Sequence, residues 1–349
     1  MTNPFAGAIA QAAAEQPTEM QTRPKVPGLT VHVDGDYLAY YASGNDECEP
    51  GTARMNAFNL IEKFSALTGA TNAVVHNTAS GCHKGERYLA ATVKPYQGQR
   101  DGSRRPKNYP YLRELLLNYT GDAFRTKVWT TREADDGFGA CAYFAAGNPA
   151  QAGYAALATA DKDMRMLPGL HVDWTKLCLT TVKPGEYEVI GPNDKIYGLK
   201  WFWLQMLMGD TADNCPGLEY IYLPVIPGKE PKMAKCGEKT ALKALQGIDN
   251  HEDAYRAVAD YYRYGYRGRE PKAGWPVFAY DRFVEQAALM WMRTGPKAEL
   301  IDFAQHKGPG GFSHLFDQAM WDAVERLDKR VKAARAELDQ YDDSLENVG

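Results

Sequence analysis

The sequence lacks the cysteine patterns that mark several common classes of protein. Its six cysteines are scattered and form no CxxC pair, which argues against a zinc knuckle, a thioredoxin-type redox motif and a disulfide framework. Its N-terminal stretch contains no basic segment leading into a long apolar run, so neither a signal peptide nor a membrane span is expected there. A reducing cytoplasm is therefore the expected location.

The sequence also lacks a net positive charge and the histidine motifs of common hydrolases. The formal net charge is −4, so any binding of nucleic acid has to come from local basic patches. The seven histidines show no HExxH spacing, and none is paired by motif with a nucleophilic serine or cysteine. These absences argue against a zinc protease of that type and against a serine or cysteine hydrolase.

What the sequence does contain is an alternation of short strands and helices in its first half. Apolar, β-branched runs are separated by segments of helical spacing, which predicts an α/β fold with a mostly parallel central sheet flanked by helices. The second half is expected to be helical. The predicted parts are a flexible arm at 1–28, an α/β domain at 29–200 with a basic segment at 84–108, a helical module at 201–330, and a charged helix end with an acidic tail at 331–349.

Acidic side chains follow three of the predicted strands at the point where each strand ends. Ligands of an open parallel sheet bind outside the carboxyl ends of its strands, so these positions are candidates for a site. Seven carboxylates cannot share a site unless cations neutralise them, and oxygen ligands suit Mg²⁺ or Mn²⁺. Such ions indicate phosphate chemistry. The residues are Asp34, Asp36, Glu133, Asp135, Asp136, Asp161 and Asp163.

Each acidic motif alone has an ordinary structural explanation, as a turn or as a helix cap. Their repetition at successive strand ends is what favours a common site. A fourth pair, Asp210 and Asp213, is spaced so that both side chains can face the same way on a helical turn. Further along, Gly237 precedes a helix start with Lys239 and Thr240 beside it, where backbone N–H groups can hold a phosphate.

A basic segment between residues 84 and 107 carries seven basic side chains against two acidic ones. Such a segment would suit a single-stranded 5′ end, because its cations can contact phosphates and its aromatic rings can stack on bases. The alternative interpretation is a solvated charged loop without a binding role. The candidates for contact with DNA are Lys84, Arg87, Lys94, Tyr96, Arg100, Arg104, Arg105 and Lys107.

Taken in order, the motifs DGD, ExDD, DKD, MGDxxDNxPG and GxKTA resemble those of the 5′ nuclease family, the flap endonucleases and 5′→3′ exonucleases, and especially the exonucleases of short-tailed phages. The likeness covers most of residues 29–245. It implies a PIN-like nuclease fold, two Mg²⁺ ions for which Mn²⁺ can substitute, and a helix, three-residue turn, helix element that holds duplex DNA. It assigns metal roles to Asp34, Glu133, Asp135, Asp161, Asp163, Asp210 and Asp213, with Asp36 and Asp136 close by.

The same resemblance implies that the basic segment forms an arch or clamp over the active site. The sequence YQGQR at 96–100 is similar to the family motif YKGNR, so Arg100 matches the arginine that contacts the scissile phosphate. Two departures stand out. Asn77 and Thr78 follow the second strand where relatives have a further aspartate, and Gln97 replaces the arch lysine, with Lys84 or Lys94 as a substitute. The segment between Pro216 and Gly237 is also longer than the family's turn.

The resemblance implies hydrolysis of DNA phosphodiester bonds at 5′ ends or flaps, in phage replication or DNA degradation within a bacterial host's cytoplasm. Double-stranded DNA is the expected partner, with RNA–DNA hybrids as a further substrate. Two alternatives remain. A PIN-like RNA endonuclease would share the strand-end aspartates but lack the duplex-holding element, and a DNA-end-binding protein with weakened catalysis would fit Asn77 and Gln97.

Overall fold

The computed structural model describes residues 22–98, 104–223, 233–265 and 279–346, and it divides into two units. The first unit comprises Met1–Cys82, Ser103–Pro184 and Val189–Lys195, and the second comprises His83–Gly102, Gly185–Glu188 and Ile196–Gly349. Residues 84–102, most of the basic segment, are therefore grouped with the second unit, whereas the sequence placed all of it in the α/β domain. Across the described ranges, no helix is long and apolar enough to span a membrane.

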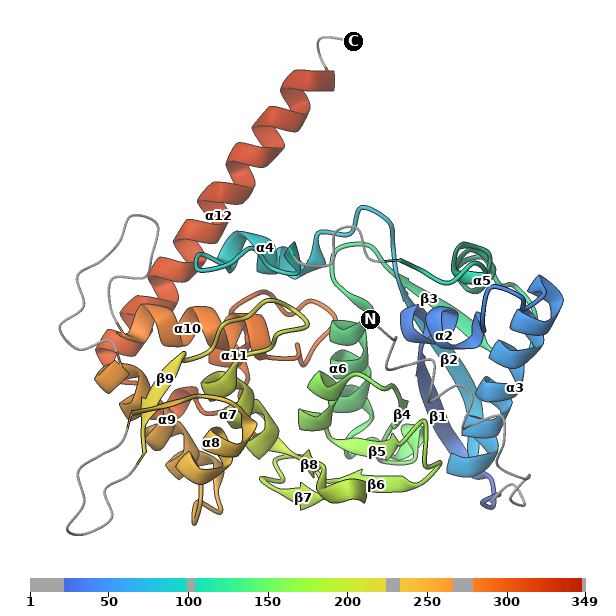
Figure 1. The fold of residues 1–349 in the computed structure, drawn as a ribbon, viewed down its shortest axis with the longest axis horizontal. Helices are drawn as coiled ribbons and strands as arrows, with labels where there is room; N and C mark the ends of the chain where they lie inside the picture. The colour runs from blue at the N-terminus through green and yellow to red at the C-terminus, as the bar shows by residue number, and fades with distance from the viewer. Residues whose placement is uncertain (1–21, 99–103, 224–232, 266–278, 347–349) are drawn as a thin grey trace. The chain divides into compact units, whose positions relative to one another are not determined.

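The first unit is built on a six-stranded sheet with the order β3-β2-β1-β4-β5-β6 (Figure 1). Strands β1 to β5 run parallel, and β6 pairs antiparallel with β5, so the prediction of a mostly parallel sheet is confirmed. The strands are β1 (Val26–Asp34), β2 (Ala70–Thr78), β3 (Arg125–Trp129), β4 (Ala156–Ala158), β5 (Gly169–Val172) and β6 (Leu179–Val182). A separate short strand is β7 (Val189–Ile190).

Helices connect and cover these strands. In the longest of them, Ala53, Ala57, Ile61, Phe64 and Leu67 recur at helical spacing and are buried in the core. Its end is set by Gly69, which adopts a left-handed conformation and donates its N–H to the carbonyl of Ser65. The helices are α2 (Gly35–Ala42), α3 (Pro50–Thr68), α5 (Tyr109–Leu117) and α6 (Ala134–Ala145), with 3₁₀ turns at Pro149–Gln151, Lys162–Met166 and Pro192–Asp194.

The second unit is mostly helical, as predicted, and its core is aromatic. The rings of Phe202, Trp203 and Phe312 pack against one another with centroids 4.8–5.8 Å apart. Its elements are η1 (Lys84–Glu86), α4 (Arg87–Ala90), β8 (Ile196–Tyr197), α7 (Leu199–Met208), β9 (Tyr220–Tyr222), β10 (Met233–Lys235), α8 (Glu238–Ala244), α9 (His251–Gly265), α10 (Ala279–Met290), α11 (Asp302–Gln305), η6 (Ser313–Leu315) and α12 (Gln318–Glu346). Helix α12 continues to Glu346, so most of the stretch expected to be a charged helix end and acidic tail is helical.

Burial of histidine in the sheet makes stability depend on pH. His171 of β5 is 4% exposed and its Nε2 lies 2.9 Å from the carbonyl oxygen of Leu167. Burial lowers the pKa of His171 to about 4. Between pH 6.5 and 4 the unfolded chain therefore binds a proton that the folded chain does not, so the free energy of unfolding falls as the pH falls through this window.

We expect His171 alone to cost about 2 kcal/mol of stability between pH 7 and pH 5. Urea unfolding of the wild type and His171→Gln at both pH values measures this difference. The variant should lose less stability on acidification than the wild type, and an equal loss in both proteins would show that His171 does not contribute.

Candidate functional site

The first strand ends in a buried carboxylate. Asp34 is 6% exposed and caps α2, because its Oδ1 accepts the backbone N–H of Tyr37 at 2.9 Å. Its other oxygen, Oδ2, accepts the hydroxyl of Thr159 at 3.1 Å. The side chain is thus held at the carboxyl end of β1, where the sequence predicts a site.

Thr159 joins Asp34 to the acidic motif that follows β4. Its Oγ1 accepts the backbone N–H of Asp161 at 3.0 Å, and an oxygen of Asp161 in turn accepts the N–H of Asp163 at 2.8 Å. Since β1 and β4 are neighbours in the sheet, the two strand ends are linked by one hydroxyl. Sequence reasoning missed Thr159, although its position two residues before Asp161 was a usable signal.

The charges of this region act on one another. The pKa of Asp34 is raised to about 7, first by burial, then by the charge of Asp36, and further by that of Asp161. Ionising all three carboxylates together is therefore unfavourable unless a cation is present. Their hard oxygen donors fit a divalent ion such as Mg²⁺ or Mn²⁺. The oxygen donors at these strand ends thus fit the predicted metal.

Asp36 is held by groups that the sequence did not single out. Its Oδ2 accepts the backbone N–H of Thr78 at 3.1 Å, and its Oδ1 pairs with the guanidinium of Arg113. Arg113 also donates to the carbonyl of Thr78. Both oxygens of Asp36 thus already have a partner, and its observed role is to tie α2 to the end of β2 and to α5. A role as a metal ligand stays a prediction.

Thr78 also fixes the start of the third acidic motif. Its hydroxyl oxygen accepts the backbone N–H of Ala134, the first residue of α6, at 2.9 Å. Glu133 and Asp135 are partly buried on either side of that residue, and Asp136 is completely buried. The last residue of β2 therefore contacts the acidic segment that begins α2 and the one that begins α6.

Asn77, which stands where relatives have an aspartate, packs against the DGD motif. Its Nδ2 lies 3.4 Å from the carbonyl oxygen of Leu116, and among described residues its buried Oδ1 has no hydrogen-bond partner. That oxygen lies against Gly35, where a Cβ would collide with it and would come within 2.6 Å of the carbonyl oxygen of His76. Only glycine lets α2 begin this close to β2.

Gly35→Ala should therefore push the start of α2 away from β2 and lower the free energy of unfolding by about 1–3 kcal/mol. Urea unfolding measures the effect. Gly51→Ala is the matched control, because Gly51 lies near the start of α3 and a Cβ there meets nothing within 4 Å. Equal stability of the two variants would contradict the packing argument.

Three side chains with metal-binding atoms also lie inside the first unit. Those atoms of His32, His76 and Cys141 are within 4.8 Å of one another. However, the indole N–H of Trp129 donates to Nδ1 of His76 at 3.0 Å, so Nε2 of His76 carries the proton and donates to Nδ1 of His32 at 2.9 Å. An ion would have to displace that proton. We therefore assign these rings a structural role, as a polar chain across β3, β2 and β1.

In the second unit, the predicted Asp210 and Asp213 lie in a tight turn after α7. Asp210 is 2% exposed and accepts the N–H of Ala212 at 2.6 Å. Asp213 accepts the hydroxyl of Tyr96 at 3.1 Å and the side-chain amide of Gln97 at 3.0 Å. These two contacts bind the YQG sequence to the turn. The pair's metal role remains a prediction.

Gln97 connects a lysine to this turn. The ammonium of Lys84 donates to Oε1 of Gln97 at 2.6 Å, while the amide of Gln97 donates to Asp213. Of the two substitutes considered for the missing arch lysine, Lys84 is thus joined to the acidic turn through Gln97, and Lys94 is exposed.

Two candidates for contact with DNA are corrected by their burial. Arg87 is 1% exposed and donates to the carbonyl oxygens of Leu289 and Trp291 at 3.2 and 3.1 Å, so it does not reach a phosphate. Tyr96 is 8% exposed and hydrogen-bonded to Asp213, so its ring is not available for stacking. A count of basic residues cannot reveal that a guanidinium turns inward.

The remaining basic residues differ in their surroundings. Arg104 is exposed and pairs with Asp46, and Arg105 lies over the ring of Tyr109, 5.1 Å from its centroid. Lys107 is exposed. Arg100 lies outside the described residues.

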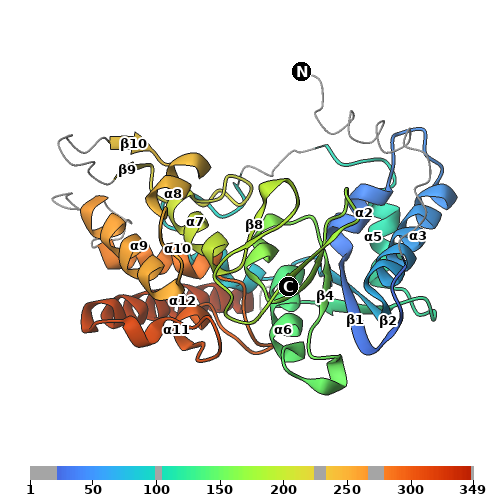
Figure 2. The same cartoon turned by 90° about the horizontal axis from the view of Figure 1, so that it is seen from below.

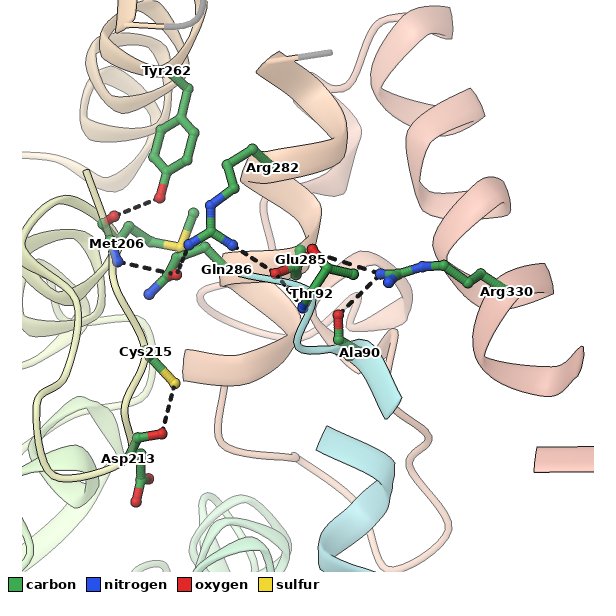
Figure 3. A network of polar contacts seen from close by, with 11 residues as sticks. Ala90, Thr92, Met206, Asp213, Cys215, Tyr262, Arg282, Glu285, Gln286 and Arg330 are labelled. Atoms are coloured by element: carbon green, nitrogen blue, oxygen red, sulfur yellow. Dashed lines mark hydrogen bonds and ion pairs between the residues drawn. The ribbon is translucent and has the colours of Figure 1, made fainter. Parts of the chain in front are cut away.

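The chain around Ala90 and Thr92 is attached to α10 and α12 by polar contacts (Figure 3). Glu285 is 1% exposed, and its carboxylate accepts the N–H and the hydroxyl of Thr92 at 3.1 and 2.6 Å. Arg282 donates to the same carboxylate at 2.7 Å, and Arg330 donates to the carbonyl of Ala90 at 3.0 Å. This part of the basic segment is therefore built into the second unit.

The predicted phosphate-holding residues lie at the start of α8. Gly237 precedes the helix, is exposed, and accepts the N–H of Thr240 at 2.9 Å. Lys239 is exposed and Thr240 is partly buried. Their contact with DNA remains a prediction.

Comparison with known proteins gave one relative by sequence and several by structure. No family model matches the chain. DNA polymerase I of Bacillus caldotenax is 30% identical over 155 residues, which are 44% of this chain and 15% of that protein. The chain thus spans only a small part of that relative's length.

The solved structures are of proteins from bacteriophage T5. A complex of the flap endonuclease with DNA and metal ions has a TM-score of 0.46 and 15% identity, covering 87% of this chain and 99% of that one. The 5′-exonuclease with bound zinc has a TM-score of 0.46 and 16% identity over the same shares. These are the structures of a flap endonuclease and a 5′-exonuclease to which the chain is similar.

Proposed function

We propose that the chain is a divalent-metal-dependent 5′→3′ exonuclease and 5′ flap endonuclease that hydrolyses phosphodiester bonds of DNA. The observation that carries the proposal is the linkage of Asp34 and Asp161 through Thr159 at two adjacent strand ends. The pKa of Asp34 is raised to about 7, first by burial and then by neighbouring carboxylates, and a cation bound there would offset that repulsion.

Within this proposal, the carboxylates act as ligands and not as proton shuttles. Asp34 and Asp161 hold Mg²⁺ or Mn²⁺, and the other strand-end carboxylates, Glu133, Asp135 and Asp163, complete the donor set. When bound, the ions neutralise phosphate charge and lower the pKa of the attacking water. Thr159 and the Arg113–Asp36 pair position these side chains.

Cations outside the acidic site hold the DNA backbone. Lys94, Lys107 and Lys239 are exposed and suit contacts with phosphates. Such contacts carry no sequence information, so we expect low sequence specificity and a strong dependence of binding on salt. We further propose a role in phage replication, either primer removal or degradation of DNA, with RNA–DNA hybrids as a second substrate.

A second candidate is a DNA-end-binding protein with weakened catalysis. It is favoured by Asn77, which places an amide where relatives carry a carboxylate, and by the pairing of Asp36 with Arg113. Such a protein would bind duplex ends but take up fewer divalent ions than the nuclease.

Cleavage of duplexes labelled at either end, with and without a 5′ flap, tests the proposal. Release from the 5′ end in Mg²⁺ and none in EDTA is the expected result, with Asp161→Asn as the inactive comparison. Release from the 3′ end first, or equal cleavage by the variant, would contradict it. Tight binding of DNA ends without any cleavage would support the second candidate.

A further inference from the structure

The unusually long segment between Pro216 and Gly237 contributes a two-stranded antiparallel sheet to the second unit. Strand β9 pairs with β10 so that Met233 lies opposite Tyr222 and Lys235 lies opposite Tyr220. Strand β9 packs against α9 (Figures 1 and 2). Because side chains alternate along a strand, the buried Ile221 faces inward and its two neighbours face outward.

The outward side of this sheet is aromatic and exposed. Tyr220 is 42% exposed, Tyr222 39% and Met233 59%. The ring of Tyr222 also meets that of Tyr264, at the end of α9, edge to face with centroids 4.9 Å apart, and Tyr264 is itself 52% exposed. We call Tyr220, Tyr222, Met233, Lys235 and Tyr264 together the tyrosine face. A contiguous exposed surface of this kind usually serves binding.

The charges beside the tyrosine face suit an anionic ligand. Lys235 belongs to the face, and Lys239 and Lys243 follow it on α8. All three are exposed, and none of them forms an ion pair with another described residue. Among the described residues close to them in sequence, the exposed acids are Glu219 and Glu238.

We propose that the tyrosine face binds unpaired bases of a DNA strand, with the rings stacking on bases and the lysines contacting phosphates. Stacking on tyrosine tolerates every base, which matches an enzyme that acts without sequence preference. The lysines suit the phosphates of a nucleic acid, and the tyrosine rings suit its bases. This inference rests on the proposed function, and it assigns a role to the segment that exceeds the family's simple turn.

Fluorescence anisotropy of labelled DNA in EDTA tests the inference, because it measures binding while no metal is present for cleavage. The probes are a blunt duplex and the same duplex with a single-stranded extension of about ten thymidines at either the 5′ or the 3′ end. The double variant Tyr220→Ala, Tyr222→Ala should bind one or both extended probes about tenfold more weakly than the wild type and the blunt probe equally well. Tyr220→Phe, Tyr222→Phe keeps the rings and should restore binding.

Tyr111→Ala is the matched control, because Tyr111 is an equally exposed tyrosine (39%) in the first unit. Lys235→Ala should reduce the salt dependence of binding to the extended probe. Unchanged affinity of the alanine double variant for both extended probes would overturn the inference, and so would equal losses on blunt and extended DNA. The proposed function fails in a different assay: the wild type would then release nothing from DNA 5′ ends in Mg²⁺, whatever the binding measurements show.

Discussion

Asp34→Asn is expected to reduce Mg²⁺-dependent cleavage at DNA 5′ ends by roughly a hundredfold or more. The substitution removes one negative charge from the end of β1, where the charges of Asp36 and Asp161 already raise the pKa of Asp34. Asparagine remains a good helix cap and can still accept the N–H of Tyr37, so the fold should be retained. Initial rates with a 5′-labelled duplex, together with urea unfolding, measure both effects.

The control for this prediction is another side-chain cap outside the site. Asn148 caps the turn Pro149–Gln151 by accepting the N–H of Ala150, and Asn148→Asp makes the reverse exchange beside Gly28, near the start of β1 and not at its end. That variant should cleave as the wild type does. Cleavage by Asp34→Asn within a few-fold of the wild type would rule out Asp34 as a ligand.

Glu285→Ala is expected to lower the free energy of unfolding by about 3–5 kcal/mol. The carboxylate is buried and accepts hydrogen bonds from Thr92 and Arg282, so its loss leaves a buried guanidinium and a backbone N–H without this acceptor (Figure 3). The segment around Thr92 should also separate from α10. Urea unfolding measures the loss, and hydrogen exchange at Thr92 reports the detachment.

Glu325→Ala supplies the comparison on an exposed pair. Glu325 and Lys329 of α12 form an i,i+4 ion pair whose side chains are 63% and 73% exposed. Such pairs contribute at most about 0.5 kcal/mol, because solvent screens them. If Glu285→Ala costs no more than Glu325→Ala, the buried network does not hold the basic segment in place.

Parts of this account follow from the sequence because they depend on local patterns. The order of strands and helices predicted a mostly parallel sheet, and parallel strands end at one edge. That is why Asp161, far from Asp34 in the chain, lies close enough to help raise the pKa of Asp34. The strands β5 and β6 were not predicted, since such short strands leave little periodicity.

Other parts could not be predicted because they depend on tertiary contacts. Nothing in the neighbourhood of Arg113 indicates that it pairs with Asp36, 77 positions earlier. Likewise, the basic segment was identified from its charge alone, and charge does not distinguish the buried Arg87 from the exposed Lys94. The hydroxyls of Thr78 and Thr159 belong to no acidic motif, yet they contact three of them, at Ala134, Asp34 and Asp161.

The most direct test of the central claim is calorimetric titration of the chain with Mn²⁺ in the absence of DNA, for the wild type and for Asp34→Asn and Asp161→Asn. The account predicts saturable binding by the wild type and about tenfold or greater weakening in each variant, in parallel with loss of 5′-end cleavage. Binding of equal affinity in all three proteins, or cleavage that persists in EDTA, would contradict it.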